Sequence, residues 1–338
     1  MKMTAIATAM TTLITGSALA AEVYNSDGTS LAVGGRAEFR GDFAGKDSGE
    51  ELDGTMNNKS RFRLNADMNT SITSDLDGFA FYEAEQTVNS SSGNDSNTDF
   101  KQRYMYVGLS TNGNSVSFGR QDTAVVQISQ MSDISTYSGD QKAFIDAGNE
   151  QINNTFLYTG EFMDSLTIKA DYVASDEDSD DSYGISGVYV TPIGLGVGLG
   201  YAAGEVNGSG DTDQFIAGLN YTWEDLYLAG TYTTGSADDD ANLDFEGYEF
   251  AASYSFASHL TAILVYGKQE IDDEDFGKRI NKNDYVELTG VYKFNRSLRA
   301  YLSYKMNMLE ADDWSYDGTT LSDYDADDSV RLGLRYDF

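Results

Sequence analysis

An alternation of apolar and polar residues with a period of two recurs along the chain and constrains its fold more than any other feature. In residues 297–308, the even positions from Leu298 to Met308 are apolar, while the odd positions from Arg299 to Asn307 are mostly polar. Residues 31–40 and 330–338 repeat the pattern. Because successive side chains of a strand point to opposite sides, this alternation predicts long β-strands with one apolar and one polar face.

The connections between the predicted strands alternate in length. Short connections fall at residues 73–77, 111–114, 160–164, 191–194, 223–225, 257–259 and 295–297. Long polar connections fall at residues 45–58, 88–99, 121–150, 175–181, 206–212, 236–245, 271–281 and 311–327. Together these connections join sixteen strands, and an even number of strands with short turns at one end and long loops at the other is typical of outer-membrane barrels.

A soluble β-sandwich and a transmembrane barrel both explain two-faced strands. Three features favour the barrel: strands of about 10–14 residues against the usual five or six, aromatic residues near strand ends, and the regular alternation of turns and loops. The single Pro and the 34 Gly suit a continuous sheet with tight turns. We therefore predict an all-β fold, a 16-stranded antiparallel transmembrane β-barrel, which is wide enough to leave an aqueous channel.

The N-terminal residues have the composition of a secretory signal peptide. Lys2 is the only charge in residues 1–20, residues 5–14 are largely apolar, and residues 18–20 read Ala-Leu-Ala, a typical cleavage site. No later stretch is long and apolar enough to be a membrane-spanning helix. We expect cleavage near Ala20 and a single barrel domain over residues 21–338.

Charge and composition exclude several functions. A net charge of −33 opposes nucleic-acid binding, which needs basic surfaces. The absence of Cys and the single His, predicted in the 257–259 turn, argue against an enzyme and against a metal centre or other cofactor. Carboxylate clusters at residues 176–181, 238–240, 272–275 and 323–328 lie in predicted outer loops. They could bind calcium or magnesium, but solvated acidic loops are the simpler interpretation.

Three segments resemble the trimeric general porins of Gram-negative bacteria: residues 21–28 (AEVYNSDG), residues 74–78 (SDLDG) and the last residues, Tyr336-Asp337-Phe338. The similarity follows strand order through the mature chain and is most specific in the first strands and at the C-terminus. It implies a homotrimer of barrels in the outer membrane, in contact with lipid and lipopolysaccharide. It also implies a third outer loop folded into the lumen, which here would be residues 121–150.

The length and sequence of residues 121–150 also set this loop apart without the resemblance. Structureless loops of that length are uncommon unless they are functional. Apolar residues occur among its polar ones, namely Val125, Val126, Ile128, Phe144 and Ile145. The alternative to an inward fold is a surface flap with a small apolar cluster of its own.

The resemblance also implies a charged pore constriction, in which basic residues of the barrel wall face carboxylates of the inward loop. The matching wall positions are Arg36, Arg63, Lys101 and Arg103, and on the first two strands the alternation independently places the arginine opposite the apolar face. On the loop, Asp133 matches one family carboxylate, Tyr137 replaces the second, and Asp140 could substitute for it. Gln151 stands in place of a further wall arginine, which removes positive charge and favours cations.

These observations predict an outer-membrane porin through which small hydrophilic solutes and ions diffuse passively, with a weak preference for cations. Opposed charges across a narrow passage produce a transverse field that orients polar solutes. A barrel with a mainly adhesive or envelope-anchoring role is the alternative, and ion conductance separates the two.

Overall fold

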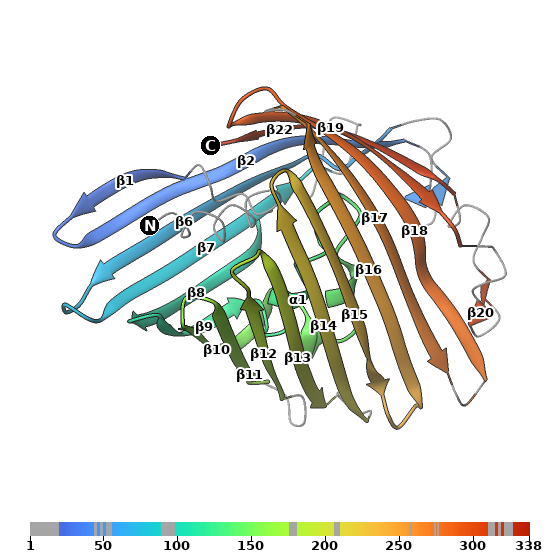
Figure 1. Cartoon of the computed structure of the whole chain (residues 1–338), viewed down its shortest axis with the longest axis horizontal. Coiled ribbons are helices and arrows are strands. Elements are labelled where there is room, and N and C mark those ends of the chain that lie inside the picture. Colours follow the sequence, from blue (N-terminus) through green and yellow to red (C-terminus); the bar gives the residue numbers. More distant parts are fainter. Residues whose placement is uncertain are drawn as a thin grey trace.

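The structure, a computed structural model, describes residues 20–43, 46–47, 50–51, 56–88, 99–175, 181–205, 210–256, 259–273, 275, 277–309, 315–316, 319–320 and 327–338. The predicted signal peptide, apart from Ala20, lies outside these residues. Most of the carboxylate clusters predicted at 176–181 and 323–328 lie outside them as well. Figure 1 shows long strands arranged side by side in a curved wall around the element labelled α1.

The strands close into one antiparallel barrel, since the last strand pairs both with the long strand before it in the chain and with the first long strand. In order around the wall they are β2 (Thr29–Phe43), β6 (Arg61–Ser71), β7 (Asp77–Thr87), β8 (Lys101–Thr111), β9 (Asn114–Gln121), β10 (Ile152–Phe162), β11 (Leu166–Val173), β12 (Ser182–Val190), β13 (Leu195–Glu205), β14 (Asp211–Trp223), β15 (Leu226–Asp238), β16 (Leu243–Phe256), β17 (Leu260–Asp273), β18 (Lys278–Lys293), β19 (Leu298–Asn307) and β22 (Ser329–Asp337). The prediction of a sixteen-stranded antiparallel barrel is confirmed.

The remaining strands are short. β1 (Ala21–Ser26) and β5 (Asn57–Asn58) also pair with β2. β1 continues β22 along the same edge of β2. Phe338 pairs with Gly35 through two backbone hydrogen bonds, and Ala21 lies opposite Val33, two residues earlier in β2. Two small hairpins, β3–β4 (Lys46–Asp47 and Glu50–Glu51) and β20–β21 (Ser315–Tyr316 and Thr319–Thr320), lie in the first and last long connections.

The short connections gather at one end of the barrel, as predicted. Between β8 and β9 the turn is Asn112-Gly113, with φ of 45° and 79°; both residues have the positive φ that a two-residue hairpin turn requires. Two predicted long loops are wrong. β15 and β16 pair through most of residues 236–245, and β17 and β18 pair through most of residues 271–281. Polar residues in an antiparallel hairpin keep their backbone hydrogen bonds in water, so a polar sequence alone did not indicate a loop there.

The two faces of the wall differ as the alternation predicts. The outer face exposes an apolar band that includes Ile185, Leu199, Leu219, Leu264, Leu288 and Leu302. Exposed aromatic side chains flank it, with Tyr254, Phe256, Tyr292, Phe294 and Tyr336 toward the short turns and Tyr183, Tyr201, Phe215 and Tyr232 toward the other end. An apolar band between two aromatic girdles is the surface that a barrel presents to a membrane.

Several strand pairs contain a register shift, and the one between β7 and β8 changes which residues face the lumen. Glu83 of β7 lies opposite Tyr104, but its neighbour Ala84 lies opposite Gln102, so Arg103 is the extra residue of a β-bulge. Tyr104, Tyr106 and Gly108 therefore face the lumen, while Met105, Val107 and Leu109 are exposed on the outer face. Strict alternation from Arg103 would have placed the first three residues on the outer face, and the bulge reverses that.

The loop between β9 and β10 folds into the barrel, which confirms the inward-folded third outer loop. It contains α1 (Val126–Ser129) and two short 3-10 turns, η2 (Asp140–Lys142) and η3 (Asp146–Gly148). Its apolar side chains form two clusters with the inner wall. Val125, Ile128, Ile145 and Ala147 pack with Ala202, Ile216 and Phe245, whereas Ile134 packs with Ala251, Ile263, Val265 and Tyr285. None of the helices among the described residues has the length and apolarity needed to cross a membrane.

Candidate functional site

Two buried carboxylates of the wall hold the inward loop in place. Glu287 of β18 accepts hydrogen bonds from the Ser135 hydroxyl (2.7 Å) and from the backbone N–H groups of Thr136 and Tyr137 (3.2 and 3.1 Å). Glu249 of β16 accepts one from the backbone N–H of Gly139 at 2.9 Å. Hydrogen bonds from backbone and side-chain donors of residues 135–139 to these two buried side chains fix the turn in place.

The tip of the loop reaches almost around the lumen to the closing strands. The Thr136 carbonyl accepts a hydrogen bond from Arg331 of β22, whose guanidinium also pairs with Asp42 of β2 at 2.7 Å. The same guanidinium lies 3.9 Å above the Tyr137 ring. The loop therefore lines the inner wall from β11, where Asp171 accepts from the Ala124 N–H, to β22.

The opposite stretch of wall, on β2 and β6 to β8, carries a cluster of ion pairs. Its arginines are Arg36, Arg40, Arg61, Arg63 and Arg103, and its carboxylates are Glu38, Glu83 and Glu85. We call these eight residues the wall cluster. They meet because β2, β6, β7 and β8 are neighbours and their inward positions lie level in the register.

Short distances join the members of the wall cluster. Arg63 lies 2.6 Å from Glu85 and 3.1 Å from Glu83, and Glu83 also accepts from Arg103 at 2.9 Å. Arg61 lies 2.6 Å from Glu38. Each arginine is thus held against the wall by a carboxylate, which reduces the positive potential that the arginines would otherwise project into the lumen.

The structure brings three of the four predicted wall residues together, namely Arg36, Arg63 and Arg103. Arg36 is 4% exposed and lies 3.8 Å from Glu85. Lys101 lies opposite Glu85 in the register and is exposed. Whether these residues and the loop carboxylates form the narrowest part of the pore stays a prediction.

Asp133, one of the two predicted loop carboxylates, forms an ion pair with a basic residue of its own loop. The ammonium nitrogen of Lys142 is 2.6 Å from Asp133 and 2.8 Å from Glu150. Burial lowers the pKa of Lys142, but these two carboxylates outweigh it and hold the pKa above its usual value. Asp140 is the first residue of η2, and burial raises its pKa to about 6.

Sequence reasoning missed the partners of the predicted basic residues. Glu83 and Glu85 occupy inward positions of β7. The alternation of inward and outward residues that was used for β2 and β6 would have found them. Lys142 was missed because its ion pairs depend on how the loop turns back, with Asp133 and Glu150 on either side of it in the chain.

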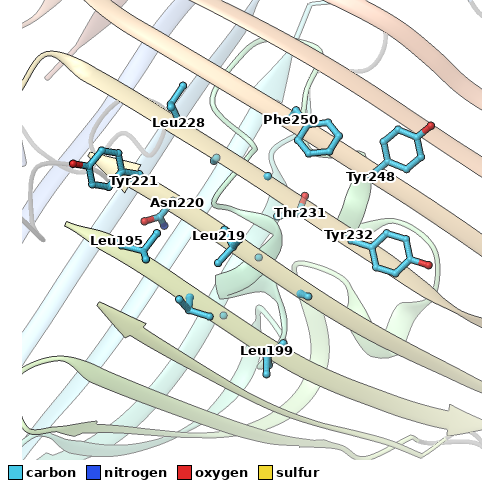
Figure 2. A pocket seen from close by; sticks show the side chains of 16 residues that line it. Leu195, Leu199, Leu219, Asn220, Tyr221, Leu228, Thr231, Tyr232, Tyr248 and Phe250 are labelled. Carbon is cyan, nitrogen blue, oxygen red and sulfur yellow. The ribbon is translucent and has the colours of Figure 1, made fainter. Parts of the chain in front are cut away.

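A hollow of about 910 Å³ lies on the outer wall over β13 to β16 and is not part of the lumen. Figure 2 shows the side chains around it, including Leu199, Leu219, Leu228, Tyr232 and Phe250. These residues belong to the exposed apolar face. The inner side of the same wall is filled by the loop, since Ile128 and Met131 lie against Gly198 and Gly218.

The described residues show no cluster of metal-binding side chains. No group of three or more His, Asp or Glu residues within them is placed to hold a metal ion. His259 lies at the short turn between β16 and β17, where its Nδ1 is 2.9 Å from the Lys293 carbonyl oxygen. The interior instead carries charged and polar side chains on the wall cluster and on the inward loop.

Comparison with known proteins agrees with this geometry. The sequence profile of a family described as Gram-negative porin matches residues 5–313. Porin-like protein L of Photobacterium profundum is 33% identical over 341 residues, which cover 96% of each chain. Among solved structures, Salmonella typhi OmpF in complex with daunomycin is similar over 94% of this chain and 100% of its own, with a TM-score of 0.81 and 20% identity. The trimer form of OmpT, an outer membrane protein of Vibrio cholerae, matches over 92% of this chain and 100% of its own, with a TM-score of 0.69 and 18% identity.

Proposed function

Because the chain belongs to the Gram-negative porin family, we propose that it is an outer-membrane diffusion channel for small hydrophilic solutes and ions with a weak preference for cations. Its place in the outer membrane and its role as a porin follow from the family and the barrel. It is not an enzyme. The preference for cations is the part that the proposal adds.

The carboxylates of the inward loop are the observation that carries this preference, and the glutamates of the wall cluster reduce the charge that opposes it. On one side of the lumen, Glu38, Glu83 and Glu85 offset three of the five arginine charges of the wall cluster. On the other side the loop presents Asp133, Asp140 and Glu150 against the single Lys142. Charges in a narrow passage act through little water, so the balance at this level counts for more than charges on the outer loops.

The proposed constriction consists of Arg36, Arg63, Lys101 and Arg103 on the wall and of Asp133 and Asp140 on the loop. Its opposed charges would give the transverse field that selects polar solutes. Purified protein in planar bilayers tests the function. Stable channels whose conductance rises with salt concentration are expected, and a protein that inserts without conducting would instead favour an adhesive or anchoring role.

We also propose that the protein assembles as a homotrimer, as the trimer form of Vibrio cholerae OmpT does. On β2, β6 and β7 the outward positions include short side chains, among them Gly35, Ala37, Ala66, Ala80 and Ala84. A face of small residues lets two barrels approach closely. Cross-linking in mild detergent should trap a trimer, and trapping only monomers would contradict this assembly.

Lipid and lipopolysaccharide are the proposed surroundings of the remaining outer face, with the short turns toward the periplasm and the long loops outward. Beyond the aromatic girdle on the long-loop side the outer face becomes charged, with Lys268 3.0 Å from Glu270. The change from aromatic to charged side chains marks the expected edge of the bilayer.

A further inference from the structure

Four aromatic side chains form a patch on the inner face of β7 and β8, directly beside the wall cluster. The ring centroids are 5.6 Å apart for Phe81 and Tyr106, 6.1 Å for Phe81 and Tyr104, and 6.4 Å for Phe79 and Tyr106. We call these four residues the aromatic patch. Such distances are those of interacting aromatic rings, so the four side chains form one surface.

The register places the aromatic patch in the lumen. Phe81 lies opposite Asp67 on one side and Tyr106 on the other, and residues opposite each other in an antiparallel pair share a face. Glu83 and Glu85 continue the same face of β7 into the wall cluster. The bulge at Arg103 is what turns Tyr104 and Tyr106 inward. Without it, both would point toward the membrane.

The loop leaves this part of the wall open. It packs against β12 to β17, and its hydrogen bonds extend to β18, β19 and β22. Asp122 of the loop contacts the aromatic patch, because its carboxylate accepts a hydrogen bond from the Tyr104 hydroxyl at 2.9 Å. All four aromatic side chains remain partly exposed. Phenylalanine rings partly exposed in an aqueous channel need a reason beyond packing.

A carboxylate completes the surface. Asp67 is exposed and lies next to Phe81 on the inner face, where it accepts a hydrogen bond from Asn69 at 2.8 Å. The face of an aromatic ring is electron-rich and attracts cations, and a carboxylate attracts the same charge. The neighbouring Arg63 and Arg103 are already paired with glutamates, which weakens their repulsion of a cation at Asp67.

We propose that the aromatic patch and Asp67 form a subsite for aromatic cations, such as an arylalkyl ammonium ion, on their way through the channel. The ring of the solute stacks on Phe81 and Tyr106, and its ammonium group pairs with Asp67. The inference rests on the proposed function only in that solutes must enter the lumen. It adds a class of solute that general diffusion does not distinguish.

Block of the ion current tests the subsite. Tryptamine is added to wild-type channels in planar bilayers and its apparent affinity is compared with that of three probes. These are propylamine, which has the charge without the ring, indole, which has the ring without the charge, and indole-3-acetate, which has the opposite charge. Tryptamine should bind about tenfold more tightly than propylamine, a ratio within the range of cation–π and stacking contributions.

Two variants locate the site, and a third serves as control. Phe81→Thr removes the ring and keeps a residue suited to a strand, while Asp67→Asn removes the charge at nearly constant volume. Each should lower tryptamine affinity about tenfold and leave propylamine block within about twofold. Glu161→Gln is the matched control, because Glu161 is an exposed carboxylate on the inner face of β10, about 19 Å away across four strand spacings.

The possible outcomes separate this inference from the proposed function. Channels that do not conduct contradict the proposed function. Channels that conduct but are blocked equally by tryptamine and propylamine contradict the subsite alone. Equal block by indole or indole-3-acetate overturns the role of Asp67, and loss of tryptamine block in Glu161→Gln overturns the location. Since Asp67→Asn conserves volume, the test stands even if Phe81→Thr does not fold.

Discussion

Lys142 lies between two carboxylates of the inward loop, with its ammonium nitrogen 2.6 Å from Oδ2 of Asp133. The pair is partly exposed, at 16% for each side chain. The charge that Asp133 presents to the lumen is therefore partly cancelled by a residue of the same loop. Removing the charge of Asp133 and removing the charge of Lys142 should therefore change the preference for cations in opposite directions.

Asp133→Asn should lower the preference for cations about twofold, because it removes a negative charge beside the aqueous path and leaves Lys142. Lys142→Gln should raise the preference by a similar factor. The measurement is the cation-to-anion permeability ratio in dilute salt. Asp240→Asn, an exposed carboxylate at the turn between β15 and β16, is the control and should change little. Equal shifts in all three variants would mean that the loop does not form the constriction.

Glu85→Gln should shift selectivity toward anions more than Glu161→Gln does. Glu85 contacts Arg63 at 2.6 Å and Arg36 at 3.8 Å, so its loss leaves both guanidinium groups less compensated. Both variants lose one lumenal carboxylate, but only Glu85 belongs to the wall cluster. Indistinguishable permeability ratios would show that the arginines do not govern the ion path.

Glu287→Gln should loosen the loop, because the amide replaces one acceptor oxygen by a donor opposite the N–H groups of Thr136 and Tyr137. A loss of about 1–3 kcal/mol is expected for such a buried mismatch. The readouts are a lower thermal midpoint of unfolding and noisier single-channel currents. Glu270→Gln, which breaks an ion pair with Lys268 on the outer face, is the control for stability alone and should leave the current noise unchanged.

Selectivity should depend on pH near 6. Burial raises the pKa of Asp140 to about 6, so this carboxylate is ionised above that pH and neutral below it. The preference for cations should therefore fall as the pH is lowered from 7 to 5. Asp122, whose pKa burial also raises to about 6, contributes over the same interval. Asp140→Asn should flatten part of this step. A step unchanged in that variant would assign the titration to other groups.

The barrel could be predicted from the sequence because every strand must present apolar residues to lipid and polar residues to water, which leaves a period of two. Residues 121–150 were identified by their length and their apolar residues. The register could not be predicted. A single bulge at Arg103 reverses the facing of Tyr104 and Tyr106, and nothing in the local pattern marks it.

The charge partners of the candidate site could not be predicted from the sequence, for a related reason. Arg61 and Glu38 are 23 residues apart, and Thr136 and Glu287 are 151 residues apart. Their contacts follow from strand order and from the path of the loop inside the barrel. Sequence reasoning identified three of the arginines of the wall cluster as constriction residues and missed the glutamates that compensate them, so it overestimated the basic side of the lumen.

The reversal potential of single wild-type channels under a tenfold gradient of potassium chloride at pH 7 tests the central claim most directly. We predict a potential of the sign that cation flow produces, of modest size and larger in dilute salt, because screening weakens as the salt concentration falls. A potential of the opposite sign would mean that Arg36, Arg63, Lys101 and Arg103 dominate the path despite the glutamates beside them. It would contradict the proposal that the loop carboxylates make this porin prefer cations while glutamates of the wall cluster compensate the arginines.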